Sequence, residues 1–302
     1  MNILIAGGTG LVGTSLTKLL LEKGHQISYL SRTKKNIPQL KVYQWDIKAG
    51  NIEEGAIETA DVIINLAGAG VTDKSWTPAY KRELYDSRIL ATRLLVTALK
   101  ERKHTVKLVI QASAIGIYGL NTGDAWLHET SPKGTDFLAR LTADWEHEAM
   151  LVAQPTIRSV VFRIGVVLSK EGGAFKKLTL PIKLFSGAAI GTGKQYLSWV
   201  HSDDLCAMFL MAIENQKITG IYNAIAPTPV TNAELTKILA KELHRPLFLP
   251  NVPAFVLKMG MGEMADIVLG GNRVAATKLL TDGFQFKFPS AEIAVKELVK
   301  KK

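Results

Sequence analysis

A chain of 302 residues is long enough for one large domain or two modest ones. Its apolar content of 47% and charged content of 21% are typical of a globular protein with a sizeable core, and no apolar run is long enough to cross a membrane. Because Cys206 is the only cysteine, an internal disulfide is excluded, and with no sign of a secretory signal we expect a cytoplasmic protein.

The formal net charge is +10, which is one indication of nucleic-acid binding. However, the lysines and arginines are spread along the chain, and the one tight run is Lys300–Lys302. We therefore interpret the charge as solvated side chains with an attraction for an anionic cofactor. We expect neither a nucleic acid nor a membrane as partner.

The first predicted element is a short apolar strand, Ile3–Ala6, which runs into a glycine-rich turn and then an amphipathic helix. The turn fits both G-x-G-x-x-G and G-x-x-G-x-x-G. Such a turn lets backbone N–H groups and the positive end of a helix approach a pyrophosphate. Gly10 would allow close approach, and Gly13 would let the helix pack on the strand. The alternative is a glycine turn without a ligand, but we predict that a dinucleotide binds here, at Gly7, Thr9, Gly10, Leu11, Val12 and Gly13.

Strands and helices alternate as far as about residue 225, and this alternation predicts an α/β fold with a Rossmann-type, doubly wound parallel sheet. The predicted strands after the first are Gln26–Leu30, Val42–Trp45, Asp61–Ala67, Val106–Ala112, Ser159–Val167 and Gly220–Ala224. The predicted helices are one from Pro78 to about Lys103 with Thr77 as cap, then Asp136–Val152 and Asp203–Glu214.

The pattern changes after about Ala226. We predict a helix over Thr231–His244, several short helices, a phenylalanine-rich strand, Phe284–Phe288, and a last helix, Ala291–Lys300. The chain would then form a dinucleotide-binding domain over 1–167 and 200–225. A smaller, mostly helical substrate-side domain, over 168–199 and 226–302, would lie at the carboxyl ends of the strands, where doubly wound sheets bind ligands.

The residues after the second strand distinguish two dinucleotides. An NAD-binding unit has an acid about 20 residues past the glycines, which holds the ribose 2′-hydroxyl. This strand ends in Ser31-Arg32-Thr33-Lys34-Lys35 and offers no acid. Ser31 can donate a hydrogen bond, and Arg32 can make a charge-assisted fork to phosphate oxygens. The sequence therefore predicts NADP(H), with an ordinary solvated loop as the alternative.

Two further segments concern the same ligand. Asp46, just after the third strand, can accept from the adenine amino group or cap the next turn, and both interpretations remain open. The fourth strand leads into Gly68-Ala69-Gly70, small residues that would let a ribose lie against the backbone.

Further motifs follow one another along the whole chain. They are Asn65–Gly68, Ser87-Arg88, Gly116–Gly119, Asp144–Glu146, Arg163–Leu168, Gly191–Gln195, Ser198–Asp204 and the tail Pro253–Phe288. In order and spacing they resemble the extended short-chain dehydrogenase/reductases, and within them the NAD-dependent epimerase family proteins that carry a small C-terminal domain, here about 250–297. The resemblance implies that the cofactor is contacted by Ser31, Arg32, Leu66, Ala67, Glu83 and Arg88. For Glu83 and Arg88 the alternative is a surface ion pair.

The catalytic pattern of that family is broken in this sequence. Related enzymes use a serine together with a tyrosine and a lysine four positions apart on one helix face. The helix that should carry the last two has neither: Phe137 or Leu138 occupies the tyrosine place, and Leu141 or Thr142 the lysine place. The serine place falls on Ala114. Ser113 stands one residue earlier, so its side chain should point to the other face of the strand.

Other groups could carry a relocated acid/base, and Tyr118, Ser113, Glu129, His201 and Asp203 are the candidates. Tyr118 could instead pack with its hydroxyl hydrogen-bonded, and His201 and the aspartates after it could cap the following helix. The substrate is expected to be contacted by Arg163, Gln195 and Trp199, although Arg163 could instead form a buried ion pair. No two histidines have metal-ligand spacing, so we expect no metal site.

The sequence therefore predicts an NADP(H)-binding oxidoreductase or epimerase that acts on a small polar molecule, with a sugar nucleotide as one candidate. Its first step would be hydride transfer at nicotinamide C4. Two alternatives are transfer to an acceptor that needs little proton help, and an NADPH-binding regulator or sensor without turnover. Paired long helices in this superfamily are compatible with a homodimer.

Overall fold

The computed structural model describes residues 1–152 and 156–300, which fold into two compact units. Unit 1 comprises Met1–Ser113, Leu141–Phe162 and Cys206–Tyr222, and unit 2 comprises Ala114–Arg140, Arg163–Leu205 and Asn223–Lys302. In the described chain, no helix is long and apolar enough to cross a membrane.

Unit 1 is built on the central sheet, which in the described chain has eight strands in the order β12-β8-β6-β5-β1-β2-β3-β4. Strand β1 pairs in parallel with β2 on one side and β5 on the other, and the parallel pairing continues to β3 and to β6. Only β4 is shown antiparallel, against β3. The chain thus builds outward on both sides of β1, which confirms the doubly wound, Rossmann-type sheet. Its strands are β1 Asn2–Ala6, β2 Gln26–Ser31, β3 Lys41–Asp46, β4 Asn51–Ile52, β5 Val62–Asn65, β6 Leu108–Ala114, β8 Arg158–Ile164 and β12 Gly220–Ala224.

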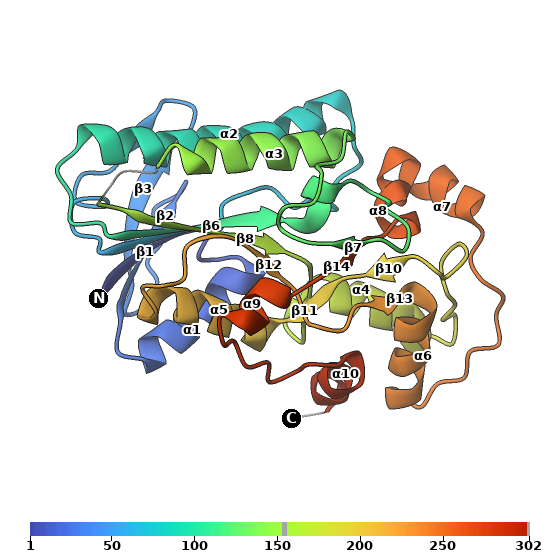
Figure 1. Cartoon of the computed structure of the whole chain (residues 1–302). Coiled ribbons are helices and arrows are strands. Elements are labelled where there is room, and N and C mark those ends of the chain that lie inside the picture. Colours follow the sequence, from blue (N-terminus) through green and yellow to red (C-terminus); the bar gives the residue numbers. More distant parts are fainter. Residues whose placement is uncertain (153–155, 301–302) are drawn as a thin grey trace. The chain divides into compact units, whose positions relative to one another are not determined.

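Helices cover both faces of this sheet (Figure 1). Helices α2 (Pro78–Glu101) and α3 (Phe137–Met150) run side by side on one face, and α1 (Leu11–Glu22) and α5 (Ser202–Glu214) lie on the other. The hydrophobic core beneath α2 includes Leu4, Ile63, Leu95 and Val96. Burying such side chains is the main driving force for this layered arrangement.

The start of α2 confirms the predicted cap. The Thr77 hydroxyl accepts a hydrogen bond from the Tyr80 N–H at 3.1 Å, and Pro78 occupies the first turn, where its missing N–H costs nothing. The helix ends at Glu101, two residues before the predicted end.

Unit 2 packs three helices around a second core. These are α4 (Gly173–Lys183), α6 (Asn232–Glu242) and α10 (Ala291–Val299), which surround Trp199, Leu235 and other apolar residues. Helix α6 begins with a capping box formed by Thr231 and Glu234. The shorter helices are η1 Ile115–Tyr118, α7 Ala254–Met261, η2 Gly262–Ala265, α8 Asp266–Leu269 and α9 Thr277–Thr281. Short strands form three pairs: β7 (Trp126–Leu127) with β14 (Arg273–Val274), β9 (Val166–Ser169) with β11 (Trp199–His201), and β10 (Tyr196–Leu197) with β13 (Val230–Thr231).

Two predicted strands were wrong. The run Ser159–Val167 is divided at Gly165 into β8, in the central sheet, and β9, which pairs with β11. A side chain at Gly165 would meet the Ser198 carbonyl at 2.5 Å, so the chain must change course at a residue without Cβ. The segment Phe284–Phe288 forms no strand, because the N–H groups of Lys287 and Phe288 donate to the Asp204 carboxylate, at 2.9 and 3.0 Å, instead of to a neighbouring strand.

The compact units divide the chain differently from the predicted domains. The segment Ala114–Arg140 belongs to unit 2, although the sequence analysis assigned it to the dinucleotide-binding domain. Residues 168–199 and 226–302 lie in unit 2. The assignment of separate roles to the two parts stays a prediction.

Candidate functional site

Unit 1 contains a cavity of about 700 Å³ at the carboxyl ends of β1, β2 and β5. A volume of this size is typical of small-molecule and cofactor sites. Its wall combines five segments: the glycine turn, the end of β2, the end of β3, the loop after β5 and the first turns of α2. The lining residues are Gly7–Gly10, Tyr29–Thr33, Lys35, Trp45, Ile47, Leu66–Gly70, Asp73, Lys74, Tyr80, Glu83 and Ser87.

The glycine turn is held by close backbone packing. A Cβ on Gly13 would lie 2.6 Å from the Gly7 carbonyl oxygen and from the Gly8 Cα, so α1 can approach the turn this closely only with glycine there. At Gly10, a Cβ would meet only the Gly7 carbonyl oxygen, at 3.3 Å. Gly10 therefore presents bare backbone to the cavity that it lines.

Helix α1 begins at this turn without a capping side chain. Gly10 is its N-cap, no side chain bonds to the first N–H groups, and the first turn carries no acidic residue. The first N–H groups of a helix have no intrahelical acceptor and carry a partial positive charge. The cavity therefore offers an anion the same backbone donors that the sequence analysis predicted.

The end of β2 adds positive charge to the wall. Arg32 uses its carbonyl oxygen to accept from Gln44, at 3.2 Å, but its guanidinium has no hydrogen bond or ion pair within the described residues. The neighbouring Lys34 pairs with Glu53 at 2.9 Å. Bonds from the Gln44 N–H and then from Lys34 hold the pKa of Glu53 below its usual value. Because Glu53 is already paired, Arg32 and Lys35 remain the available cations of this segment.

Glu83 and Arg88, which both lie on α2, do not form the ion pair considered in the sequence analysis. Glu83 lines the cavity and pairs with Lys74 at 3.0 Å. Arg88 points beneath the loop after β5, where it donates to the carbonyl oxygens of Leu84 and Ala69 and lies 5.2 Å from the Trp145 ring. Burial lowers the pKa of Arg88 to about 10. Arg88 thus supports the loop from below and is not itself part of the cavity wall.

Asp46 adopts the second of its two predicted roles. Its Oδ1 accepts from the N–H groups of Lys48 and Ala49, both at 2.9 Å, and so caps the turn after β3. Its neighbours Trp45 and Ile47 line the cavity, but Asp46 does not. Contact between Asp46 and an adenine stays a prediction.

Sequence reasoning missed the polar network below the cavity floor. The Asn65 side chain donates to Thr92 at 3.1 Å and to Gln111 at 2.9 Å, and it accepts from the Ala67 N–H at 3.1 Å. Trp145 donates to the same Thr92 hydroxyl. Asn65 is fully buried, so these bonds fix the start of the loop that carries Leu66, Ala67 and Gly68. A polar residue ending an apolar strand was the available signal.

The helix expected to carry the proton-transfer pair has no such groups in place. Leu141 and Thr142 are buried in unit 1. Ser113 donates to the buried Glu146 of α3, at 2.6 Å, so its side chain faces this helix. Ser113 does not line the cavity.

The Tyr118 hydroxyl is fully occupied within unit 2. It donates to Asn223 Oδ1 at 2.6 Å and accepts from Arg163 Nη1 at 3.0 Å, and burial raises its pKa. Arg163 also donates to the Glu129 carbonyl oxygen, while the Glu129 carboxylate accepts from the Asn223 N–H. Tyr118 and Arg163 are each 3% exposed. Tyr118 is therefore buried with its hydroxyl hydrogen-bonded, which was the alternative to a role as acid/base. The hydrogen bonds shown for Arg163 go to neutral groups, the Tyr118 hydroxyl and the Glu129 carbonyl oxygen.

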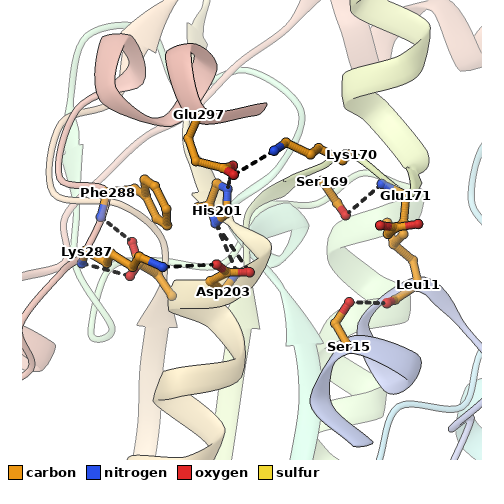
Figure 2. A network of polar contacts seen from close by, with 11 residues as sticks. Leu11, Ser15, Ser169, Lys170, Glu171, His201, Asp203, Lys287, Phe288 and Glu297 are labelled. Atoms are coloured by element: carbon orange, nitrogen blue, oxygen red, sulfur yellow. Dashed lines mark hydrogen bonds and ion pairs between the residues drawn. The ribbon is translucent and has the colours of Figure 1, made fainter. Parts of the chain in front are cut away.

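His201 is the centre of a second polar cluster in unit 2, which Figure 2 shows. Its Nδ1 accepts from the Asp203 N–H at 3.1 Å, so Nε2 carries the proton and donates to Glu297, at 3.2 Å. Lys170 also pairs with Glu297, at 2.7 Å, and the imidazole stacks on Phe288. Burial lowers the pKa of His201. Nδ1 thus joins β11 to the start of α5, and Nε2 joins β11 to the C-terminal helix α10.

The remaining predicted substrate residues also have internal partners. Trp199 is fully buried in the core of unit 2, and its indole donates to the Thr228 carbonyl oxygen at 3.1 Å. The Gln195 amide donates to the carbonyl oxygens of Ile190 and Val268, both at 3.0 Å. Their contact with a substrate stays a prediction.

Nine of the predicted cofactor residues line one cavity, which the sequence could not have shown. They are Gly7, Thr9, Gly10, Ser31, Arg32, Leu66, Ala67, Gly68 and Glu83. The predicted residues outside its wall are Leu11, Val12, Gly13, Asp46 and Arg88.

Comparison with known proteins gives two family matches. Residues 3–224 match the NAD dependent epimerase/dehydratase family, and residues 252–298 match a domain of unknown function, DUF1731. The second match confirms the small C-terminal domain that the resemblance implied.

Individual relatives match over nearly the whole chain. The epimerase family protein YfhF of Bacillus subtilis is 38% identical over 301 residues, covering 99% of this chain and 98% of YfhF. The crystal structure of human SDR39U1 with NADPH has a TM-score of 0.90 at 32% identity and covers 99% of both chains. A nucleoside-diphosphate sugar epimerase of Corynebacterium glutamicum has a TM-score of 0.80 at 33% identity, over 99% of this chain but 58% of that one.

Proposed function

This chain belongs to the NAD-dependent epimerase/dehydratase family, and on that premise we propose that it binds NADP(H) in the cavity of unit 1 and exchanges a hydride with a small polar substrate. One observation carries the choice of dinucleotide. Arg32 lines the cavity, its guanidinium has no hydrogen bond or ion pair in the part of the chain that the structure describes, and no acid follows β2 to hold a 2′-hydroxyl. A 2′-phosphate is the group that this side chain fits.

The other walls fit the rest of the dinucleotide. The uncapped start of α1 and the bare backbone at Gly10 suit a pyrophosphate, and the small residues Ala67 and Gly68 leave room for a ribose. The nicotinamide ring would supply a carbon, C4, that gives or takes a hydride. The crystal structure of human SDR39U1 with NADPH supports this cofactor for the present chain.

The proposed class of substrate rests on similarity to relatives of this chain. The relative from Corynebacterium glutamicum is described as a nucleoside-diphosphate sugar epimerase, which supports a sugar nucleotide as one candidate. The active site would be atypical, because α3 has no tyrosine or lysine to move the proton that accompanies the hydride.

The absence of a tyrosine and a lysine from α3 also favours a second candidate function, an NADPH-binding regulator or sensor without turnover. The side chains considered as relocated acids or bases have internal partners: Ser113 bonds to Glu146, Tyr118 to Asn223 and Arg163, and His201 to Glu297 and the Asp203 N–H. A protein of this kind would keep the cavity and dispense with the proton-transfer groups.

The dinucleotide proposal is tested by titrating the purified chain with NADPH and NADH by isothermal calorimetry. We expect NADPH to bind at least about tenfold more tightly, which corresponds to about 1.4 kcal/mol. Arg32→Glu should abolish or reverse that preference, because a carboxylate repels the 2′-phosphate and accepts from a 2′-hydroxyl. Lys34→Glu is the matched control, since Lys34 already pairs with Glu53. Equal affinities for the two dinucleotides in the unaltered chain would refute the role of Arg32.

Catalysis is tested separately, by incubating the chain with NADPH and a set of sugar nucleotides. Loss of absorbance at the NADPH band, or interconversion of sugar epimers, would support the enzyme. If NADPH binds but no arm shows turnover, the regulator becomes the supported function.

A further inference from the structure

Arg273, on β14 in unit 2, has no hydrogen bond or ion pair from its guanidinium within the described residues. Its Nε is buried and has no acceptor. A buried donor without a partner is unfavourable, and such groups in native structures call for an explanation, often an absent ion or ligand. Arg273 therefore differs from buried arginines whose donors are used, such as Arg158 with two carbonyl oxygens and Arg163 with Tyr118 and Glu129.

Two aromatic rings hold this guanidinium. Its Cζ lies 4.2 Å from the ring centroid of Trp126 and 4.7 Å from that of Tyr196. Trp126 is its direct partner across the parallel pair β7 and β14, so the two side chains stand on the same face of that pair. The contacts fix the plane of the guanidinium and attract its charge, but they use none of its N–H groups.

The backbone before Arg273 is built to bring it to this place. A Cβ on Gly271 would lie 2.1 Å from the Tyr196 carbonyl oxygen, and one on Gly270 would lie 2.1 Å from that of Leu120. Only a chain without side chains at both positions can pack so closely against these two segments. The neighbouring Asn272 then ties the segment to the Gly119 carbonyl oxygen at 2.6 Å. The position of Arg273 is thus set by several independent contacts.

The site around this cation is partly open to solvent. Trp126 is 45% exposed, although indole side chains normally bury most of their surface. Figure 1 shows β7 and β14 adjacent to each other in unit 2, next to the label of β10. An exposed ring over a rigid guanidinium forms a platform for a flat group, with charged donors at its edge.

We propose that Arg273, Trp126 and Tyr196 form an oxyanion-binding subsite that takes the carboxylate or phosphate group of a small ligand. The guanidinium binds the two oxygens through its N–H groups, and Trp126 packs against the adjoining ring or apolar part. Naming this ligand a substrate rests on the proposed function; the binding itself does not.

The experiment uses the full chain and two matched ligand pairs in isothermal calorimetry. Benzoate is compared with benzamide, and uridine monophosphate with uridine, so that each pair differs by the negative charge. We expect the anion of at least one pair to bind about tenfold or more tightly than its neutral partner, and the pair that responds identifies the carboxylate or the phosphate as the source. The advantage should be lost in Arg273→Met and only partly kept in Arg273→Lys, which has charge but no planar fork.

Arg245→Met is the matched control. Like Arg273, Arg245 has a buried Nε without an acceptor in the described chain and lies over an aromatic ring, Phe185, at 4.6 Å, but one of its terminal N–H groups donates to the His244 carbonyl oxygen. The Arg245→Met variant removes one positive charge, as Arg273→Met does, and should leave the anion preference unchanged. Only binding that Arg273→Met removes counts, because a phosphate compound can also enter the cavity of unit 1. Urea unfolding of each variant establishes that the chain remains folded.

Two results would overturn the subsite: no anion preference in the unaltered chain, or a preference that survives in folded Arg273→Met. Arg273 would then serve only to pack the rings. An NADPH titration of the same samples separates this outcome from failure of the proposed function. If NADPH does not bind the unaltered chain, the proposed function fails while the Arg273 result stands.

Discussion

The predicted site residues of the two units differ in their hydrogen bonding. In unit 1, Arg32 and the first N–H groups of α1 line or adjoin a cavity and lack internal partners among the described residues. In unit 2, Tyr118, Gln195 and His201 were predicted to act on a substrate, yet each bonds to groups of its own unit. We therefore distinguish polar groups that can bind a ligand, because they have no internal hydrogen-bond partner in the described chain, from polar groups that stabilise the fold through such bonds.

This distinction matters because a residue type alone does not reveal its role. A buried hydroxyl or imidazole with both bonding positions filled stabilises the fold, and moving its proton would break those bonds. A cation that is left without an acceptor has a different meaning. Arg32 in unit 1 and Arg273 in unit 2 are such cations, and both proposals depend on them.

The largest expected effect comes from closing the glycine turn. Gly13→Ala should destabilise the chain by about 3 kcal/mol and remove NADPH binding, because its Cβ would lie 2.6 Å from backbone atoms that cannot move freely. Gly10→Ala is the contrasting variant: its Cβ would meet only one carbonyl oxygen, at 3.3 Å, so stability should change little while NADPH affinity falls. Urea unfolding and NADPH titration measure the two effects. Equal loss of stability in both variants would contradict an open cavity at Gly10.

A smaller effect is expected at the Tyr118 cluster. Tyr118→Phe leaves Asn223 Oδ1 and Arg163 Nη1 each without one partner in a buried site, so we expect a loss of about 2 kcal/mol in unfolding free energy. NADPH affinity should stay within about twofold, which is about 0.4 kcal/mol. If the variant is as stable as the unaltered chain but loses turnover, Tyr118 is an acid/base and the comparison between the units fails.

The smallest effect is a pH dependence from His201. Burial lowers its pKa below the ordinary 6.5, against the opposing charges of Asp203, Glu297 and Asp204; Lys170 and Lys287 also lie in this cluster. The unfolded chain therefore takes up the proton first, so the stability from neutral His201 is complete above pH 6.5 and declines as the pH falls from there toward the lowered value.

Thermal unfolding at a series of pH values checks this. His201→Gln should flatten the decline in stability between about pH 7 and pH 5. His25→Gln is the comparison variant in unit 1: burial also lowers the pKa of His25, so this variant should remove only the part of the decline that His25 itself contributes. A decline that persists unchanged in His201→Gln would show that His201 does not couple the C-terminal helix to pH.

Much of the fold could be predicted because its signals are local. The Thr77 cap, the capping box at Thr231 and the glycine turn each depend on residues within a few positions of one another. The wrong strand at Phe284–Phe288 shows the limit. Its apolar pattern is that of a strand, but Asp204, more than 80 residues earlier in the chain, takes the N–H groups that a strand would need.

The sequence by itself determined the cofactor prediction, because Gly7–Gly13 and Ser31-Arg32 act through backbone and charge at fixed spacing. It also showed that α3 lacks the tyrosine and lysine. Only the tertiary structure decided which polar groups are free. Tyr118 and Asn223 are 105 residues apart, and Arg273 and Tyr196 are 77 residues apart. No local pattern encodes such partners, because hydrogen bonding depends on distances that exist only after the chain has folded.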